Sequence, residues 1–253
     1  MDLSTILGLV VAIAAILGGQ AIEGGHVGSL LQLTAFIIVM GGTIGAVSVS
    51  APPKVLKRGL RMFPRAVKPP KDDSAELSAQ IVELAALARR EGVLALEAKL
   101  ANVTEPLLKR GIGMVVDGID RAVTREILEA QVSHHAKDET AAAKIWESAG
   151  GFAPTVGIIG AVLGLIHVME NLSDPSKLGG GIACAFVATV YGVAAANLLF
   201  LPVAAKLKMH VAKEKDRAIM IVEAVMAIQE GLSSSALAEK LTSYGGHPPV
   251  AAK

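Results

Sequence analysis

Four long apolar runs constrain what this chain can fold into more than any other feature of its sequence. They cover residues 3–22, 30–51, 149–169 and 181–205, and none contains Asp, Glu, Lys or Arg. A helix needs about 20 apolar residues to cross a bilayer, so each run is long enough to do so. Buried core helices of a soluble domain are a poor alternative, because four such runs occur in 253 residues. The sequence predicts an all-α, polytopic membrane protein with four transmembrane helices.

The composition agrees with a chain that lies partly in lipid and partly in water. Hydrophobic residues make up 52% and charged residues 19%, and the net charge of +1 provides no field to attract nucleic acid. Cys184 is the only cysteine, which excludes an intrachain disulfide and a cysteine-based zinc site. The first charge is Asp2, and no basic segment precedes the first run. We therefore expect this run to remain as a span rather than to be cleaved as a signal peptide.

Basic residues predict the orientation of the spans. Seven Lys and Arg residues follow the second run before the first acid, Asp72, whereas the connections at 23–29 and 170–180 hold one lysine, Lys177. Basic loops stay in the cytoplasm. We therefore expect a multi-pass membrane protein whose long hydrophilic segments and both termini are cytoplasmic. The seven residues are Lys54, Lys57, Arg58, Arg61, Arg65, Lys68 and Lys71.

The runs divide the chain into four predicted parts. Residues 1–51 form a transmembrane hairpin, 52–148 a cytoplasmic helical domain, and 149–205 a second hairpin. Residues 206–253 form a cytoplasmic helical tail that continues the fourth span to about Leu241, with a disordered end, "GGHPPVAAK".

Inside the cytoplasmic domain, the pattern predicts helices and no strands. Asp73 and Glu76 have the spacing of a capping box before an apolar stripe, and Gly92 breaks or bends the helix that follows. A shorter helix runs from Pro106 to about Gly118, and Asp120 caps a long helix that continues into the third span.

Known catalytic motifs are missing, so we expect no enzyme, no cofactor and no metal. The sequence has no G-x-x-x-x-G-K-[ST], H-E-x-x-H or G-x-S-x-G motif. His134 and His135 are adjacent, so they cannot face one metal ion from the same side of a helix. The glycines at 179–181 are interpreted as an outer turn before the fourth span.

Glycines at i, i+4 spacing predict close helix packing in the membrane. Gly41 and Gly45 lie in the second run, and Gly160 and Gly164 lie in the third. Small residues let helices approach closely in lipid. Both packing within the chain and association between subunits fit this pattern.

Four segments are distinctive: "GGFAPTVGIIGAVLGLIHVMENL" at 150–172, "GIACAFVATVYGVAAANLLFLPVAAKL" at 181–207, "VMGGTIGA" at 39–46 and "RREGVLALE" at 89–97. They resemble the MotA/PomA family of flagellar motor stator proteins. The last two spans alone would be shared with the wider group of TolQ and ExbB, whereas the N-terminal hairpin and the Arg–Glu segment favour the motor branch.

The resemblance implies a stator subunit that couples ion flow to torque. In that family several copies form a ring around the helices of a MotB-type partner, which carries the ion-binding aspartate and a peptidoglycan-binding domain. The predicted spans of this chain hold no acid, so an ion relay would need such a partner. A TolQ/ExbB-like proton-driven energiser of outer-membrane processes is the alternative, and a passive membrane scaffold is a second one.

The resemblance also assigns residues to the ion pathway. Pro154 and Pro202 match the family's functional prolines, and both lie near the cytoplasmic ends of their spans; static kinks are the alternative. Thr189 matches a threonine that faces the ion path, 13 residues before Pro202 and so about 20 Å along a helix. Its alternative role is a hydrogen bond to the carbonyl of residue 185. Phe186, one turn away, is expected to seal the path.

The ion and the rotor contact are predicted in the same way. Ala161 and Ala188 stand where sodium-type relatives have hydroxyl ligands, which favours protons. Arg89 and Glu97 match the family's charged pair that contacts the rotor protein FliG, and Arg90 is a second candidate for the arginine. Eight residues separate Arg89 from Glu97, so on one helix they would point to one side. A solvated helix face is the alternative.

Overall fold

The computed structural model describes residues 3–68 and 73–244, and every regular element in these ranges is helical. This confirms the all-α prediction for the described residues; the predicted disordered end at 245–253 lies outside them. Contacts divide the chain into two compact units. One comprises Met1–Pro69 and Glu139–Met209, and the other comprises Pro70–Asp138 and His210–Lys253.

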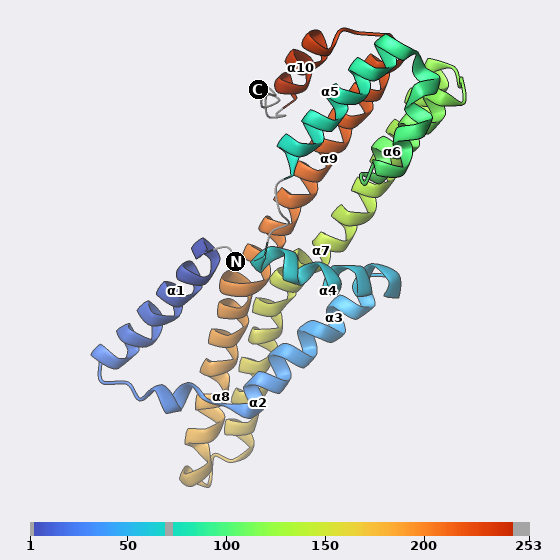
Figure 1. Ribbon diagram of the computed structural model, residues 1–253. Coiled ribbons are helices and arrows are strands. Elements are labelled where there is room, and N and C mark those ends of the chain that lie inside the picture. The colour runs from blue at the N-terminus through green and yellow to red at the C-terminus, as the bar shows by residue number, and fades with distance from the viewer. Residues whose placement is uncertain (1–2, 69–72, 245–253) are drawn as a thin grey trace. The chain divides into compact units, whose positions relative to one another are not determined.

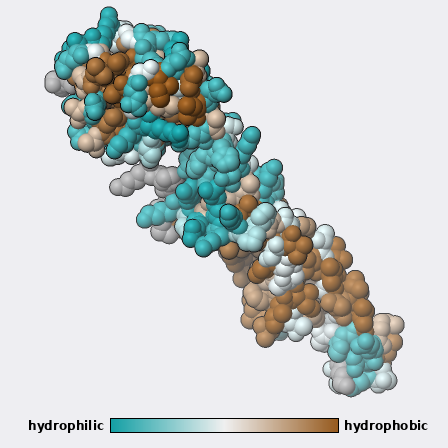
Figure 2. Space-filling view, turned by 90° about the vertical axis from the view of Figure 1, so that its right-hand side faces the viewer, coloured by the Kyte–Doolittle hydropathy of each residue, from teal (hydrophilic) through white to brown (hydrophobic). Residues whose placement is uncertain are grey.

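The first unit, here called the transmembrane unit, contains the apolar runs. Four helical segments of the chain are long and apolar enough to cross a membrane, which confirms four candidate spans. Figure 2 shows hydrophobic side chains gathered over a large part of the surface. Its complete elements are α1 (Leu3–Ile22), η1 (Val27–Leu30), α2 (Leu33–Phe36), the π-helical turn η2 (Ile37–Gly41), α3 (Gly42–Ser50), α8 (Pro175–Ala194) and the π-helical turn η4 (Ala195–Phe200). It also includes α7 (Arg121–Glu170) from Glu139 onward and α9 (Leu201–Gln229) up to Met209.

Helix α4 (Pro53–Val67) also belongs to the transmembrane unit and turns away from the direction of α3 (Figure 1). Its buried side includes Met62 and Ala66, and its Phe63 ring stacks on Trp146 of α7 with centroids 5.1 Å apart. The indole of Trp146 donates a hydrogen bond to the carbonyl of Gly59 at 3.0 Å.

One buried acid also holds α4 to α7. The carboxylate of Glu139 is buried and accepts a hydrogen bond from Arg65 at 3.2 Å, with Arg58 3.4 Å away. A buried carboxylate needs such partners because desolvation penalises its charge. Arg58 and Arg65 are therefore engaged in ion pairs within the chain.

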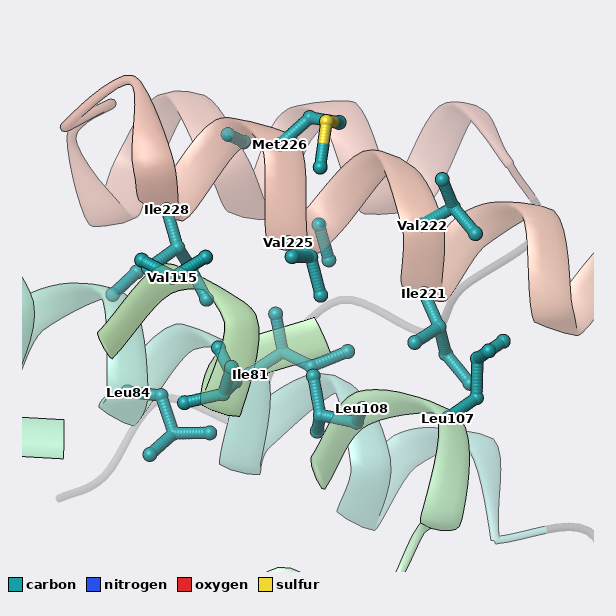
Figure 3. Packing of buried hydrophobic residues seen from close by; sticks show 14 of the residues in the cluster. Ile81, Leu84, Leu107, Leu108, Val115, Ile221, Val222, Val225, Met226 and Ile228 are labelled. Atoms are coloured by element: carbon teal, nitrogen blue, oxygen red, sulfur yellow. The ribbon is translucent and has the colours of Figure 1, made fainter. Parts of the chain in front are cut away.

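The second unit, here called the cytoplasmic unit after its predicted location, is a helical bundle around one apolar core. It consists of α5 (Ser74–Glu91), the 3-10 segment η3 (Val93–Asn102), α6 (Pro106–Val116), α10 (Ser234–Ser243), the start of α7 and the end of α9. Figure 3 shows Ile81 and Leu84 facing Val225 and Ile228 across the core, with Leu108 between the helices.

An ion-pair network lies beside this core. Glu223 of α9 accepts hydrogen bonds from Arg125 of α7 at 2.8 Å and from Lys240 of α10 at 2.7 Å. Burial raises the pKa of the Glu223 carboxyl, but the hydrogen bonds from Lys240 and Arg125 together outweigh it, so the pKa lies below its ordinary value. The network joins three helices through one half-desolvated carboxylate.

Several predicted boundaries can be compared with the structure. Asp120 caps α7 as predicted, accepting from the backbone N–H of Ala122 at 2.8 Å. The capping box at Asp73 and Glu76 is wrong, because Asp73 makes no side-chain cap and instead pairs with Arg217 at 3.0 Å. The glycine turn at 179–181 is also wrong: α8 already begins at Pro175, where the Asp174 side chain accepts from the backbone N–H of Ser176.

Two glycines with positive φ follow helix ends. Gly92 breaks its helix, which is one of the two outcomes predicted for it, whereas Gly231 ends a helix that the sequence predicted to continue. Gly92, at φ 87°, ends α5 at Glu91. Gly231, at φ 70°, follows the end of α9 at Gln229, so the tail is two helices and not one extension to Leu241. Such φ values are accessible to glycine at little cost and strained for other residues.

Candidate functional site

The third and fourth spans meet along a seam of small residues. A side chain at Gly157 would place its Cβ 2.9 Å from the Ala188 carbonyl oxygen, and one at Gly192 would lie 2.5 Å from the Ala153 carbonyl oxygen. At Gly164 a Cβ would meet the backbone N of Ala185 at 2.8 Å. The backbones of α7 and α8 are therefore as close as glycine allows.

This seam explains part of the predicted glycine spacing. Gly160 and Gly164 are used for packing within the chain, whereas a Cβ at Gly41 or Gly45 would meet nothing within 4 Å. The two second-span glycines therefore pack against no other helix in the described part of the single chain.

Two of the predicted pathway residues lie beside the seam. Ala188 is fully buried, and a Cβ at Gly160 would lie 2.7 Å from its methyl group. Thr189 is half-buried, and its hydroxyl donates a hydrogen bond to the Ala185 carbonyl at 3.3 Å. The hydrogen bond to the carbonyl of residue 185, which was the alternative role for Thr189, is thus present in the structure. The hydroxyl oxygen still has lone pairs that can accept a second hydrogen bond.

The fourth span exposes one face that continues from Phe186 to Asn197. Phe186 is 70% exposed, and Val190, Val193 and Asn197 follow at helical spacing. The Asn197 side chain donates to the Val193 carbonyl at 2.9 Å. Sequence reasoning missed Asn197, although an amide in an uncharged run, one turn after an exposed valine, could have indicated it.

A second missed residue lies on the third span. Thr155 is exposed, directly follows Pro154, and donates its hydroxyl to the Phe152 carbonyl at 2.8 Å. Ala161, the other predicted pathway alanine, is half-buried. A polar residue beside a proline in an uncharged run is a usable signal. The Thr155 hydroxyl does not replace the missing proline bond, because Pro154 removes the helical donor to the carbonyl of residue 150.

The two prolines lie in different local geometry. Pro154 is inside α7, which continues on both sides of it. Pro202 is the second residue of α9, and α9 directly follows the π-helical turn η4. A π-turn accommodates an extra residue in the helix and recurs at functional sites. The π-helical turn and the proline, which both depart from a regular α-helix, therefore lie close together along the fourth span.

Charged groups near this region lie at the ends of the spans. The Lys208 ammonium contacts the Glu147 carboxylate at 2.6 Å, and Lys206 bonds to the hydroxyl of Thr5. Among the described residues, no group of three or more His, Cys, Asp and Glu side chains could hold a metal ion. The spans themselves offer hydroxyl, amide and carbonyl groups but no carboxylate.

The predicted rotor residues lie on two different elements. Arg89 and Arg90 are exposed in the last turn of α5, and Glu97 is exposed on η3. The argument that Arg89 and Glu97 share one side of a single helix is wrong, because Gly92 ends that helix between them. Leu94, 70% exposed, lies in the segment between them and was missed.

Known proteins match this chain over nearly its full length. Residues 6–92 match the family described as motility protein A N-terminal, and residues 99–220 match the MotA/TolQ/ExbB proton channel family. The motility protein A of Helicobacter pylori is 35% identical over 247 residues, covering 96% of this chain and 95% of the relative.

Solved structures give the same result. The structure of C. jejuni MotAB matches with a TM-score of 0.91 and 34% identity, covering 100% of this chain and 99% of the other. The flagellar MotAB stator complex from Bacillus subtilis matches with a TM-score of 0.83 and 33% identity, covering 95% of each chain. The chain belongs to the MotA/TolQ/ExbB proton channel family and, within it, to the motility protein A group.

Proposed function

We propose that the chain is the multi-pass subunit of a flagellar stator, in which it forms a homo-oligomeric ring with a MotB-type partner and couples ion flow to torque. The observation that carries the proposal is the match to MotAB structures over the whole chain, N-terminal hairpin included. That hairpin supports the motor reading over a TolQ/ExbB-like energiser.

The partner supplies the ion-binding carboxylate. The spans of this chain contain no Asp or Glu, and a relay through lipid requires an ionisable group. Thr189 and the exposed face from Phe186 to Asn197 then line the path that the partner's aspartate faces, with the Phe186 ring as its seal.

Protons are the transported ion. A sodium ion needs several oxygen ligands, and Ala161 and Ala188 offer none. At 188 a longer side chain would also press on Gly160 across the seam. A proton needs only a carboxylate and water.

Pro154 and Pro202 couple the occupancy of the site to motion. Each lacks a backbone N–H, and Pro202 also adjoins a π-helical turn, so the backbone hydrogen bonding is weakest at these levels. The motion reaches the rotor protein FliG through Arg89, Arg90 and Glu97. The protein lies in the bacterial inner membrane, and the domain with these residues and both termini are in the cytoplasm.

Complementation tests this function. The chain and the MotB-type partner from its own genome are expressed in a strain that lacks its stator, and swimming speed is measured while the proton and sodium gradients are varied separately. Speed should follow the proton gradient and persist without sodium. Failure to swim, together with rescue of a strain that lacks TolQ or ExbB, would establish the energiser instead.

Thiol labelling tests the topology. A cysteine introduced singly near residue 25 or 177 should react with an impermeant reagent from outside, in a Cys184→Ala background. Labelling of a cysteine at residue 100 in intact cells would overturn it.

A further inference from the structure

Helix α4 starts at the end of the second span. Helix α3 ends at Ser50 and α4 begins at Pro53, so two residues separate a membrane-crossing helix from an amphipathic one. Figure 1 shows α4 running across the direction of α3. The buried side of α4 packs on α7 and its other side carries basic residues. An amphipathic helix that directly follows a span is the kind that lies along the membrane surface.

The basic residues of α4 divide into two groups. Arg58 and Arg65 are held by the buried Glu139. Lys54, Lys57 and Arg61 follow one another at helical spacing, are exposed, and have no ion-pair partner in the described parts of the chain. Two basic residues that follow the fourth span do have partners within the chain: Lys206 bonds to Thr5, and Lys208 pairs with Glu147.

The three side chains suit a phosphate group. Lys57 and Arg61 are four residues apart, so their side chains are neighbours about 5–6 Å apart at Cβ. A guanidinium can bind two phosphate oxygens at once, and ammonium groups add further donors. Leu60, exposed by 64%, sits beside this charged row and offers an apolar side chain to the acyl region.

We propose that Lys54, Lys57 and Arg61 form a binding site for the phosphate of anionic phospholipids in the leaflet along which α4 lies. Negatively charged headgroups are the complementary partner available at this depth, and a basic row at the membrane surface attracts them. The site depends on the position of α4 and not on the stator function, so its test uses neither torque nor ion flow.

The only tryptophan of the chain makes the site measurable. Trp146 stacks on Phe63 of α4, so its fluorescence reports on lipids next to this helix. The purified full-length chain, in its oligomeric form, is reconstituted in phosphatidylcholine bilayers containing phosphatidylglycerol with brominated acyl chains, whose bromines quench nearby tryptophan. Brominated phosphatidylglycerol should quench Trp146 more than brominated phosphatidylcholine at equal fraction. The excess should fall as salt rises.

Three charge variants decide the result. A surface Lys or Arg strengthens binding to anionic lipid about fivefold, so K54Q/K57Q/R61Q should lower the relative binding constant of phosphatidylglycerol by at least about fivefold. K54R/K57R keeps the charge and should keep the preference. K109Q/K137Q/K213Q removes the same charge from exposed lysines elsewhere and should also keep it.

Two outcomes would overturn the proposal. One is an unmodified chain with no preference for phosphatidylglycerol. The other is an unchanged preference in K54Q/K57Q/R61Q. The emission spectrum of Trp146 in pure phosphatidylcholine checks that α4 still packs on α7 in each variant, because a displaced α4 would expose the indole and shift its emission.

Discussion

The phenolic hydroxyl of Tyr191 donates a hydrogen bond to the carbonyl of Leu30 at 2.5 Å, although 161 residues separate them. The same oxygen accepts from the backbone N–H of Gln32 at 3.3 Å. Between η1 and α2 the chain leaves the helix, so these backbone groups lack helical partners, and in a membrane they must be satisfied within the protein. The Phe36 ring packs edge-on against Tyr191.

Tyr191→Phe should therefore destabilise the transmembrane unit while keeping the ring. Hydrogen bonds between membrane helices contribute about 0.6 kcal/mol on average and up to about 1.7 kcal/mol, and this oxygen makes two. Unfolding of the purified chain in mixed micelles measures the loss. Tyr244→Phe, at the exposed second tyrosine, is the matched control and should leave stability unchanged. Equal stability of both variants would mean that water can replace the hydrogen bonds of Tyr191 to the Leu30 carbonyl and the Gln32 N–H.

Thr189→Val should reduce proton flux and torque with the oligomer still assembled. Valine keeps the shape of threonine but removes the hydroxyl, which in the structure bonds to Ala185 and has lone pairs left for the path. Thr189→Ser keeps the hydroxyl and should retain most activity. Proton uptake by vesicles carrying the complex measures the flux directly. Normal flux in the valine variant would leave Thr189 with only its bond to the backbone.

Gly192→Ala should force α7 and α8 apart. The added methyl group would lie 2.5 Å from the Ala153 carbonyl oxygen, and overpacking of this kind typically costs about 1–3 kcal/mol. Gly45→Ala is the control, since its Cβ would meet nothing within 4 Å in the single chain. Thermal stability in detergent should fall for Gly192→Ala alone. If Gly45→Ala instead prevents oligomer formation, as seen by size-exclusion chromatography, the second-span glycines serve the contact between subunits.

Glu223→Gln should destabilise the cytoplasmic unit at neutral pH by about 1.5–3 kcal/mol, the usual contribution of hydrogen bonds to charged groups. The folded state lowers the pKa of this carboxyl. Its contribution is thus fully present above the ordinary Glu pKa, and is lost as the pH falls through the lower folded-state value. The difference in melting temperature between wild type and variant, followed by circular dichroism, should shrink in that acidic range.

Glu129→Gln is the control for this comparison. Its carboxylate is 56% exposed and also pairs with Arg125, at 3.1 Å, and exposed pairs contribute only about 0–1 kcal/mol. A melting-temperature difference for Glu223→Gln that stays constant down to acidic pH would show that the amide perturbs packing and not charge.

Reversal of both Arg89 and Glu97 should reduce torque without affecting assembly. Each is an exposed charge on its own element, worth about 0–1 kcal/mol, so single reversals are expected to be mild. Matching reversals on FliG should restore part of the torque, which a tethered-cell assay measures. Full torque in the double variant would show that both residues belong to a solvated surface without a role in torque. Leu94→Ser offers a comparison for apolar contact at the same surface.

Much of the fold followed from simple patterns. The first span matches α1 at both ends, and the cap at Asp120 matches the start of α7, because an uncharged run and a capping carboxylate are local properties. Gly92 and Gly231 were harder, since a glycine can bend, break or pass through a helix, and the surrounding packing decides which. Glu139 was not recognised for the same reason: only the folded unit brings it to Arg58 and Arg65.

The candidate site was predicted unevenly. Pro154, Pro202 and Thr189 were predicted through family resemblance and stay predictions, whereas nothing in the spacing of Ala188 indicated that it packs against Gly160. Asn197 and Thr155 have hydrogen bonds to their own helices, and their exposure depends on how the spans pack. The π-helical turns have no sequence signal that we can state.

The long sequence separation between Tyr191 and Leu30 has a consequence for biosynthesis. Translation at about 5–20 residues per second means that roughly ten seconds or more pass between the synthesis of the two residues. During that interval the first hairpin is inserted without Tyr191, whose hydroxyl bonds to the backbone of Leu30 and Gln32. A cell that makes this protein must therefore keep an unfinished hairpin from degradation until the last span arrives.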